Sequence, residues 1–407
     1  MGKFDVLFQN DSALAGVKTG RAAPGRDRSV SGLPAGMWVS GGVYRAETLH
    51  EIGGSPENGG IENPEEDNAL REMGAGEHLS FLDIETTGLS GGTGTYAFLC
   101  GLGVVCGKYF KVVQFFLKNP AHEAEWLEAV DACIPEDATL VTYNGKTFDI
   151  PMLTTRHILS RMRPHWESSP HVDLLYFSRR FYRGYLESCS LGSVETNILG
   201  VRRANQDVPG YLIPEIYARY LRTGDAAPLQ GVFYHNELDI ASLASLYRRV
   251  SNALTGKAGR GREFLRAGDI WNDRGKTEAA SRLWKMALRE PESRAEASLR
   301  MAFAAKRGME HENARIWFTE ALREFSARGT SRHAAELFAI LEELAKLEEH
   351  RFMRPERALT HVTAALDAMR RARHYGTAPD IVLAKALEHR RERLLKKIRA
   401  LGDERSG

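Results

Sequence analysis

The sequence changes character at residues 251–263, where the Gly-rich and basic stretch SNALTGKAGRGRE separates two kinds of pattern. Before this stretch, short runs of β-branched and aromatic residues alternate with turn residues and helix-like segments. After it, Ala, Leu, Arg and Glu prevail and strand-like runs disappear. A chain of 407 residues also exceeds what one hydrophobic core ordinarily holds. We therefore expect an α/β domain at residues 78–254 and an all-α domain at 255–407.

The α/β domain starts with three strand-like runs, HLSFLDIE, TYAFLCGLGVV and KYFKVVQFFL, which short Gly-containing connections join. Such connections are typical of antiparallel neighbours. The next run, TLVTYN, follows a helix-like stretch at residues 121–133. A helix should open at Pro214 and close at Gly224, and a longer one is expected at 232–254, where apolar residues recur at helical spacing. These elements predict a mixed sheet with flanking helices.

Residues 1–77 are rich in Gly, Ser, Pro and charge, so they are a poor core-former. We expect this segment to be partly disordered, with a short hairpin docked on the next domain as the ordered option. The N-terminus lacks the pattern of a signal peptide, and no apolar stretch is long enough to span a membrane. The four cysteines show no CxxC spacing, which favours a reducing compartment. A cytoplasmic protein without membrane contact is the expectation.

The all-α domain contains an internal repeat at the tetratricopeptide period of about 34 residues. Five positions align at this spacing: Ala280, Leu283, Trp284, Ala287 and Leu288 align with Ala314, Trp317, Phe318, Ala321 and Leu322. A third unit at residues 356–366 is offset by about 44, so the array is irregular. We expect a tetratricopeptide-like helical repeat that binds a protein partner or extends the substrate path; a generic helical bundle is the alternative.

Acidic residues stand out on two elements of the α/β domain. In FLDIETTGL, Asp83 and Glu85 project from the same face of a strand, because side chains alternate along strands. Two carboxylates so close together repel each other unless a cation lies between them. In LVTYNGKTFDIPML, Asp149 falls in the first turn of a helix, where free N–H groups favour its ionised form.

A third element, YHNELDIASLASL, carries His235 and Asp239 four residues apart and therefore on one helical face. Taken singly, each of these signals also fits an ordinary acidic pair, a first-turn Asp or a surface His and Asp pair. Their order along the chain favours one shared site, because each carboxylate lies where it can reach the end of the sheet.

Four carboxylates, Asp83, Glu85, Asp149 and Asp239, are the ligand set of two-metal phosphoryl chemistry. Ligands that are all oxygen favour Mg²⁺ or Mn²⁺ over zinc. A neighbouring His can accept the proton of the attacking water, because its ordinary pKa lies near neutrality. The residues thus predict a site for two divalent cations, with His235 as the candidate base.

These motifs resemble the DEDD superfamily of 3'-to-5' exonucleases, which has the ribonuclease-H-like fold, and specifically its bacterial YprB-like branch with a helical repeat tail. The resemblance spans about residues 78–250. It implies that the DxE strand, the NGxxFD turn and the final helix supply the metal ligands, here Asp83, Glu85, Asp149 and Asp239. It also implies that Thr86 and Asn144 lie beside the terminal nucleotide of a nucleic-acid substrate.

The sequence departs from this superfamily just before Asp239. Other members place a His five residues before the last Asp, or a Tyr four residues before it. Here His235 occupies the Tyr position and Tyr234 occupies the His position. The helix brings His235 nearer the face of Asp239, so we assign His235 as the base and keep Tyr234 as the alternative.

Three further features have two interpretations each. Asp173 resembles an acidic position that supports the metal site, and it also fits a helix cap or a salt bridge. The net charge is only +2, so attraction for phosphate must be local. One basic and aromatic segment could grip phosphates and stack bases, or could simply cover the core: Arg179, Arg180, Phe181, Tyr182, Arg183 and Tyr185. The pair Arg202 and Arg203 is open in the same way.

Gly92, Gly94 and Ala97 loosely resemble a dinucleotide-binding fingerprint. That motif must open a helix, whereas the strand-like run YAFLCGLGVV follows here. We interpret these residues as a flexible loop over the substrate.

The sequence therefore predicts a metal-dependent nuclease, most simply a 3'-5' exonuclease of single-stranded DNA or RNA. Two alternatives are an endonuclease with the same metals and a non-catalytic adaptor that binds nucleic acid and uses its helical repeats for protein interaction. No residue in the sequence selects DNA over RNA or sets the oligomeric state.

Overall fold

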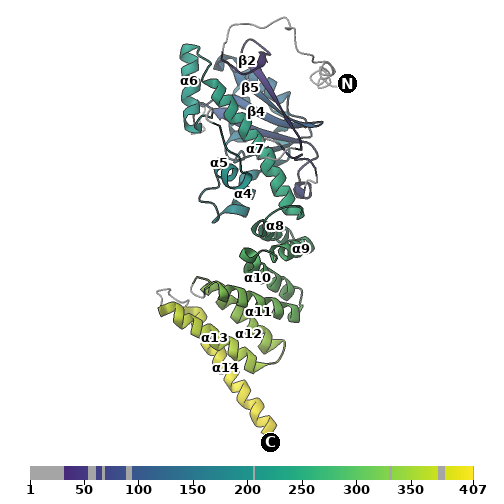
Figure 1. Ribbon diagram of the computed structural model, residues 1–407, viewed down its shortest axis with the longest axis vertical. Coiled ribbons are helices and arrows are strands. Elements are labelled where there is room, and N and C mark those ends of the chain that lie inside the picture. Colours follow the sequence, from purple (N-terminus) through teal and green to yellow (C-terminus); the bar gives the residue numbers. More distant parts are fainter. Residues whose placement is uncertain are drawn as a thin grey trace. The chain divides into compact units, whose positions relative to one another are not determined.

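The computed structural model describes residues 32–53, 61–66, 69–88, 94–204, 207–329, 332–374 and 381–406. The chain divides into two compact units, residues 1–252 and 253–407 (Figure 1). The first unit contains a β-sheet with helices around it, and the second contains helices. This is the expected succession of an α/β region and an all-α region.

Seven strands of the described residues form a single mixed sheet in the order β1-β2-β5-β4-β3-β6-β7. Pairing is antiparallel from β1 through β5 and β4 to β3, and parallel from β3 through β6 to β7. The strands are β1 (Gly36–Trp38), β2 (Val43–Glu51), β3 (Leu79–Thr86), β4 (Ala97–Cys106), β5 (Tyr109–Leu117), β6 (Thr139–Thr142) and β7 (His171–Asp173). The expected mixed sheet is confirmed, with the meander β3-β4-β5 on one side and the crossover to β6 on the other.

Strands β1 and β2 form an antiparallel hairpin at the edge of this sheet, where β2 pairs with β5 along its whole length. Residues 1–31, 54–60 and 67–68 of the N-terminal segment lie outside the described residues. The hairpin lies upstream of residue 78, the predicted start of the α/β domain, yet it shares the sheet of that domain. Its own side chains are only partly apolar, so the pairing with β5 is what orders it.

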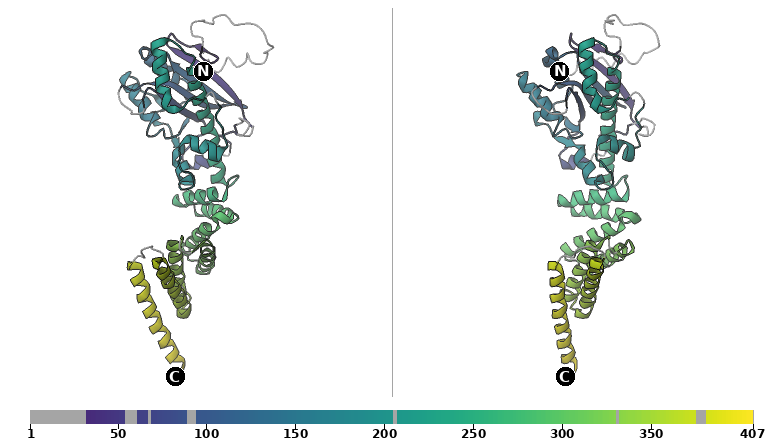
Figure 2. Two further views of the ribbon diagram at one scale, coloured as in Figure 1. Left: turned by 60° about the vertical axis from the view of Figure 1, so that its left-hand side comes forward. Right: turned by 90° about the vertical axis from the view of Figure 1, so that its left-hand side faces the viewer.

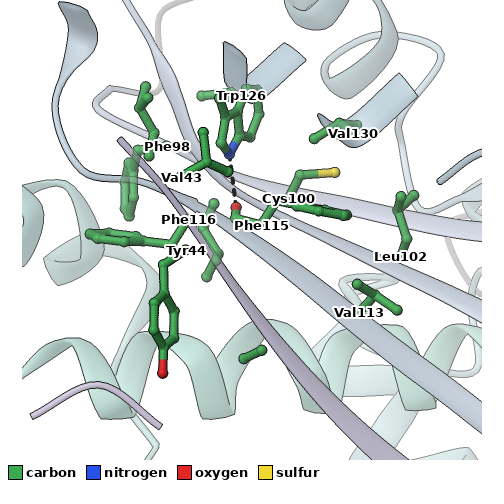
Figure 3. Packing of buried hydrophobic residues seen from close by; sticks show 14 of the residues in the cluster. Val43, Tyr44, Phe98, Cys100, Leu102, Val113, Phe115, Phe116, Trp126 and Val130 are labelled. Carbon is green, nitrogen blue, oxygen red and sulfur yellow. Dashed lines mark hydrogen bonds between the residues drawn. The ribbon is translucent and has the colours of Figure 1, made fainter. Parts of the chain in front are cut away.

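One face of the sheet packs on α2 (Glu123–Asp131) and forms a large hydrophobic core. Trp126 is fully buried there, and its indole N–H donates to the carbonyl of Phe115 at 2.9 Å (Figure 3). Val130 lies on the same helix, four residues further on, and is equally buried. This helix occupies the part of the chain where a helix was expected after β5.

The opposite face of the sheet packs on α7 (Leu229–Thr255), which crosses the strands (Figure 1). The close approach depends on two glycines of β4. A side chain at Gly101 would overlap Asn236 of α7, and one at Gly103 would lie about 2.6 Å from Ile240. Glycine at both positions therefore allows the α7 side chains to reach the sheet surface.

The remaining helices of the first unit surround the sheet. They include α3 (Asp149–Leu159), α4 (Leu174–Tyr182), α5 (Leu191–Val194) with the π-helical turn η6 (Glu195–Leu199), and α6 (Ile213–Thr223). Helix α6 carries Pro214 in its first turn and ends at Gly224, whose φ of 72° is left-handed. Both ends match the sequence prediction.

The second unit consists of successive helices, and neighbouring helices pack against each other (Figure 2). They are α8 (Gly261–Asp273), α9 (Thr277–Ala287), α10 (Pro291–Arg307), α11 (His311–Ala327), α12 (Ala334–His350), α13 (Pro355–His374) and α14 (Ile381–Ser406). The two aligned repeat segments fall on α9 and α11, and both bury alanines at the same positions. The tetratricopeptide assignment itself stays a prediction.

Two general expectations bear on the whole chain. Within the described ranges, no helix combines the length and the apolar character that crossing a bilayer requires. The cysteines Cys100, Cys106, Cys133 and Cys189 are all free thiols.

Replacing Gly101 with Ala tests the contact between α7 and the sheet. The added methyl group would overlap Asn236, so we expect the free energy of unfolding to fall by about 1–3 kcal/mol in urea denaturation. Gly41→Ala is the matched control, because nothing lies within 4 Å of its added carbon. Equal stability of the two variants would contradict the proposed steric role of Gly101.

Candidate active site

The acidic residues of β3 lie at the centre of the sheet, where antiparallel pairing gives way to parallel pairing. Asp83 is in register with Gly101 of β4 and so faces α7, whereas Leu82 is buried in the core on the α2 face. The register shifts between Glu85 and Thr86, which marks an irregularity at the end of the strand. Side chains alternate along a strand, so Leu82 and Asp83 lie on opposite faces of the sheet.

Asp149 is the first residue of α3, and it is buried. One of its oxygens accepts a hydrogen bond of 3.2 Å from the backbone N–H of Ile84, which lies between Asp83 and Glu85. This bond fixes the start of α3 to β3. The predicted first-turn position of Asp149 is confirmed, and the structure adds its direct link to the strand.

A row of contacts across three strands holds Asp83 in place. Asp83, Gly101 and Gln114 face one another in register on β3, β4 and β5. Above them lies Asn236, fully buried on α7, whose amide donates to an Asp83 carboxylate oxygen at 2.9 Å. The Gln114 amide in turn donates to the Asn236 side-chain oxygen at 2.9 Å and to the carbonyl of Phe233 at 2.8 Å.

Asp239 lies on α7 one turn beyond His235, and its carboxylate binds the guanidinium of Arg203. Arg203 comes from the irregular segment after η6. It also binds both oxygens of Glu195, each at 2.8 Å, and reaches Asp207 at 3.5 Å. Glu195 is almost fully buried, so solvent cannot stabilise its negative charge. The ion pair with Arg203 provides that stabilisation instead.

The two candidate bases have different surroundings. His235 Nδ1 lies 2.8 Å from an Asp207 oxygen and 3.0 Å from Arg203, and its Nε2 lies 3.7 Å from an Asp239 oxygen. Protonation of Nδ1 toward Asp207 would leave Nε2 with a free lone pair on the Asp239 side. The Tyr234 hydroxyl instead accepts a hydrogen bond of 3.3 Å from the backbone of Ala204.

Burial and mutual repulsion dominate the electrostatics of the site. Burial raises the pKa values of Asp83 and Glu85 well above their ordinary ranges, and the charges of Asp239 and Asp149 raise both pKa values further. Burial is also the main reason that the pKa of Asp149 rises to about 7. The hydrogen bond from Asn236 lowers the pKa of Asp83 and so offsets only part of the effect. The four carboxylates thus act on one another as a group.

Such a group fits a divalent cation by its chemistry, because it consists of oxygen donors whose repulsion a cation would relieve. Within the described parts of the chain, no three His, Cys, Asp or Glu side chains already stand close enough to hold an ion. The positive charge in contact with Asp239 is the guanidinium of Arg203. Asp83, Glu85, Asp149 and Asp239 are the residues that could hold Mg²⁺ or Mn²⁺ once the side chains converge.

The two predicted substrate contacts lie at strand ends beside these carboxylates. The Thr86 hydroxyl donates to the carbonyl of Gly88 at 2.8 Å. Asn144 has a left-handed φ of 65°, and its backbone N–H donates to Asp173 at 2.9 Å. Asp173 also caps α4 through the N–H of Leu175, so it is a cap and at the same time anchors the turn that leads to Asp149.

The basic and aromatic segment of α4 has a mixed outcome. Phe181 and Tyr182 are buried, so they belong to the core and are not free to stack on bases. Arg179, Arg183 and Tyr185 are exposed. Gly92 of the glycine-rich loop lies outside the described residues.

Sequence reasoning missed three polar partners of the site: Asn236, Gln114 and Arg203. Asn236 directly follows His235 and stands one turn before Asp239, and this spacing was the signal that could have identified it. Gln114 interrupts the apolar run KYFKVVQFFL, where a polar side chain is unexpected. In the sequence, Arg203 stands out only as part of the basic pair Arg202 and Arg203.

Comparisons with known proteins show what this chain is similar to. Residues 80–251 match the family model described as the RNase_H superfamily. "Uncharacterized protein YprB" of Bacillus subtilis (strain 168) is 41% identical over 182 residues, which are 44% of this chain and 43% of that protein. The chain thus aligns with less than half the length of this relative. A family B DNA polymerase from the hyperthermophilic archaeon Pyrobaculum calidifontis matches with a TM-score of 0.31 and 15% identity, over 48% of this chain and 29% of the polymerase.

The family match and the mixed sheet together show a ribonuclease-H-like domain, the fold that the sequence predicted. This is a nuclease-type fold. The all-helical second unit follows it along the chain.

The raised pKa values predict how stability depends on pH. A carboxyl group whose pKa is higher in the folded state than in the unfolded state lowers the free energy of unfolding as pH rises. For Asp149 this loss occurs between its unfolded pKa of 3.8 and its folded pKa of about 7. In EDTA, Asp149→Asn should therefore melt at a higher temperature than wild type at pH 8. The difference should vanish below about pH 4, because protonated Asp and Asn are then equivalent. Asp137→Asn, at an exposed carboxylate, is the control, and a wild type more stable than Asp149→Asn at pH 8 would refute the repulsion.

Divalent cations should reverse this penalty. At about 100 times its dissociation constant, Mn²⁺ should stabilise wild type by about 2.7 kcal/mol. For a domain of this size that is an increase in Tm of about 5–10 °C. Melting curves of Asp149→Asn and Asp137→Asn with Mn²⁺ provide the comparison, and only the Asp149 variant should lose most of the increase. An equal increase in all three proteins would place the cation elsewhere.

Proposed function

We propose that this protein is a metal-dependent nuclease that hydrolyses single-stranded nucleic acid from its 3' end. The observation that carries the proposal is the cluster of Asp83, Glu85, Asp149 and Asp239, four mutually repelling carboxylates from three elements of a ribonuclease-H-like domain. Carboxylates that are largely shielded from solvent and lie near one another destabilise the fold, as the raised pKa values of Asp83, Glu85 and Asp149 indicate, so their gathering points to a cation-dependent role.

The four carboxylates would hold two Mg²⁺ or Mn²⁺ ions. When bound, such ions would supply electrostatic stabilisation of the charge that develops on phosphodiester oxygens. Asn236 would keep Asp83 oriented through its hydrogen bond, and Gln114 would keep Asn236 oriented in turn.

His235 is the residue that we propose as the general base. Asp207 can bind the protonated Nδ1, which leaves Nε2 to accept a proton from water near Asp239. Thr86 and Asn144, at the ends of their strands, would contact the terminal nucleotide. Tyr234 is the weaker candidate because its hydroxyl contacts the backbone of Ala204.

The helical second unit would bind a protein partner or extend the path of the substrate. Its aligned alanines on α9 and α11 are buried at equivalent positions, as a stack of repeated helix pairs requires. We further propose that the protein acts in the cytoplasm.

The decisive experiment is a cleavage assay with 5'-labelled single-stranded and double-stranded DNA and RNA. Wild type with Mn²⁺ or Mg²⁺ should shorten a single strand stepwise from the 3' end, and EDTA should stop the reaction. Asp83→Asn should reduce cleavage to background. His235→Gln should lower kcat by about 10²- to 10⁴-fold while the Mn²⁺-dependent rise in Tm remains.

Asp137→Asn serves as the control for loss of one carboxylate outside the site, and it should cut at the wild-type rate. Loss of activity in Tyr234→Phe but not in His235→Gln would transfer the role of base to Tyr234. Cleavage of a circular single strand would show an endonuclease. Binding without any cation-dependent cleavage would favour the adaptor and overturn the enzyme proposal.

A further inference from the structure

A groove of about 690 Å³ opens beside the candidate active site, between the end of β6 and the end of α4. Its lining includes Tyr143 and Asn144, which follow β6, and Arg179 and Arg183, from the end of α4 and its C-cap. Polar side chains of the segment that leads into α5, among them Ser190, complete it.

A single turn of the backbone links the groove lining to the start of α3, where Asp149 lies. Asn144 lines the groove, and its carbonyl accepts a hydrogen bond of 3.2 Å from Phe148, the residue just before Asp149. Asp173 holds the same turn through the N–H groups of Asn144 and Lys146. The groove therefore lies next to the turn that leads to Asp149.

A hydrogen bond between two lining residues fixes the shape of the groove. The Tyr143 hydroxyl donates to the carbonyl of Cys189 at 2.5 Å, which ties the end of β6 to the segment before α5. Tyr143 is only partly exposed, and burial raises its pKa to about 12, so the hydroxyl remains protonated and keeps donating at neutral pH. The groove is thus formed by hydrogen-bonded elements.

Two exposed cations line this groove. Arg179 lies in the last turn of α4 and Arg183 is the C-cap four residues on, so their backbones are about 6 Å apart along the helix axis. Within the described residues, neither arginine forms an ion pair with an acidic side chain. Glu187 is the acidic residue of the lining, so the two arginines leave it with a net positive charge. An anion with repeated charges at short spacing would match this arrangement.

We propose that this groove binds the phosphodiester backbone of the nucleic-acid strand behind its 3'-terminal nucleotide, with Arg179 and Arg183 contacting successive phosphates. The inference rests on the proposed nuclease function for the nature of the anion. Phosphates of a stacked strand rise by about 3.4 Å per nucleotide and those of an extended strand lie farther apart, so the spacing of about 6 Å suits successive phosphates of an extended strand. Exposed polar residues of the lining, such as Ser188 and Ser190, leave the groove open to an extended single strand.

The test is the salt dependence of binding, measured by fluorescence anisotropy of labelled 20-nucleotide DNA and RNA strands with the full chain in EDTA. For single strands each lost phosphate contact reduces the slope of log affinity against log salt by about 0.7. The double variant Arg179→Gln/Arg183→Gln should therefore lose about 1.4 from the slope. It should also bind at least about tenfold more weakly than wild type at 100 mM salt.

Two further proteins make the result decisive. Arg179→Lys/Arg183→Lys keeps both charges and should keep the wild-type slope. Arg219→Gln/Arg222→Gln removes two arginines from α6, outside the groove lining, and should bind like wild type after correction for net charge. A wild-type slope for the Arg179 and Arg183 double variant, or an equal loss in the α6 variant, would overturn the proposal.

Because EDTA prevents cation-dependent cleavage, this binding result is independent of the nuclease assay. If the protein cleaves nucleic acid but the double variant at Arg179 and Arg183 binds like wild type, the groove proposal fails and the nuclease proposal stands. If the protein does not cleave but its binding depends on these two arginines, the nuclease proposal fails and the groove proposal stands. DNA and RNA strands of equal sequence show in the same experiment whether the groove distinguishes the sugars.

Discussion

The structure of the candidate site depends on the close approach of α7 to the sheet. Gly101 and Gly103 place no side chains on the face of β4 that contacts α7, and Asn236 occupies this space and reaches Asp83. Without that approach, Asp239 would lie on a distant helix and could not act on the carboxylates of β3. A steric property of two residues without side chains thus determines the electrostatics of four charged ones.

Asp239 lies between a group of negative charges and a positive charge. Toward the sheet, the buried carboxylates repel one another and raise their own pKa values. Toward the irregular segment after η6, Arg203 joins Glu195, Asp207 and Asp239 in one ionic network. Arg203 therefore supplies part of the positive charge that the acidic cluster requires, and any ion that binds must share Asp239 with it or displace it.

The parts of the fold that local pattern encodes could be predicted from the sequence. Apolar runs and capping residues identified the central strands and the ends of α6, and the carboxylates of the site appeared at recognisable positions. The place of β2 in the sheet could not be predicted, because its pairing with β5 orders it. The same holds for Asn236, Gln114 and Arg203, whose roles arise from contacts between residues far apart in the chain.

The distance along the chain between Asp83 and Asn236, 153 residues, has a consequence for the order of events during synthesis. The strand that carries the first two carboxylates leaves the ribosome long before α7, the last helix of the unit. Contacts of such large sequence separation form late in folding. A nascent or truncated chain that ends before α7 would have the acidic strand but no assembled site. Any nucleolytic capacity would therefore arise only when the whole domain has been made.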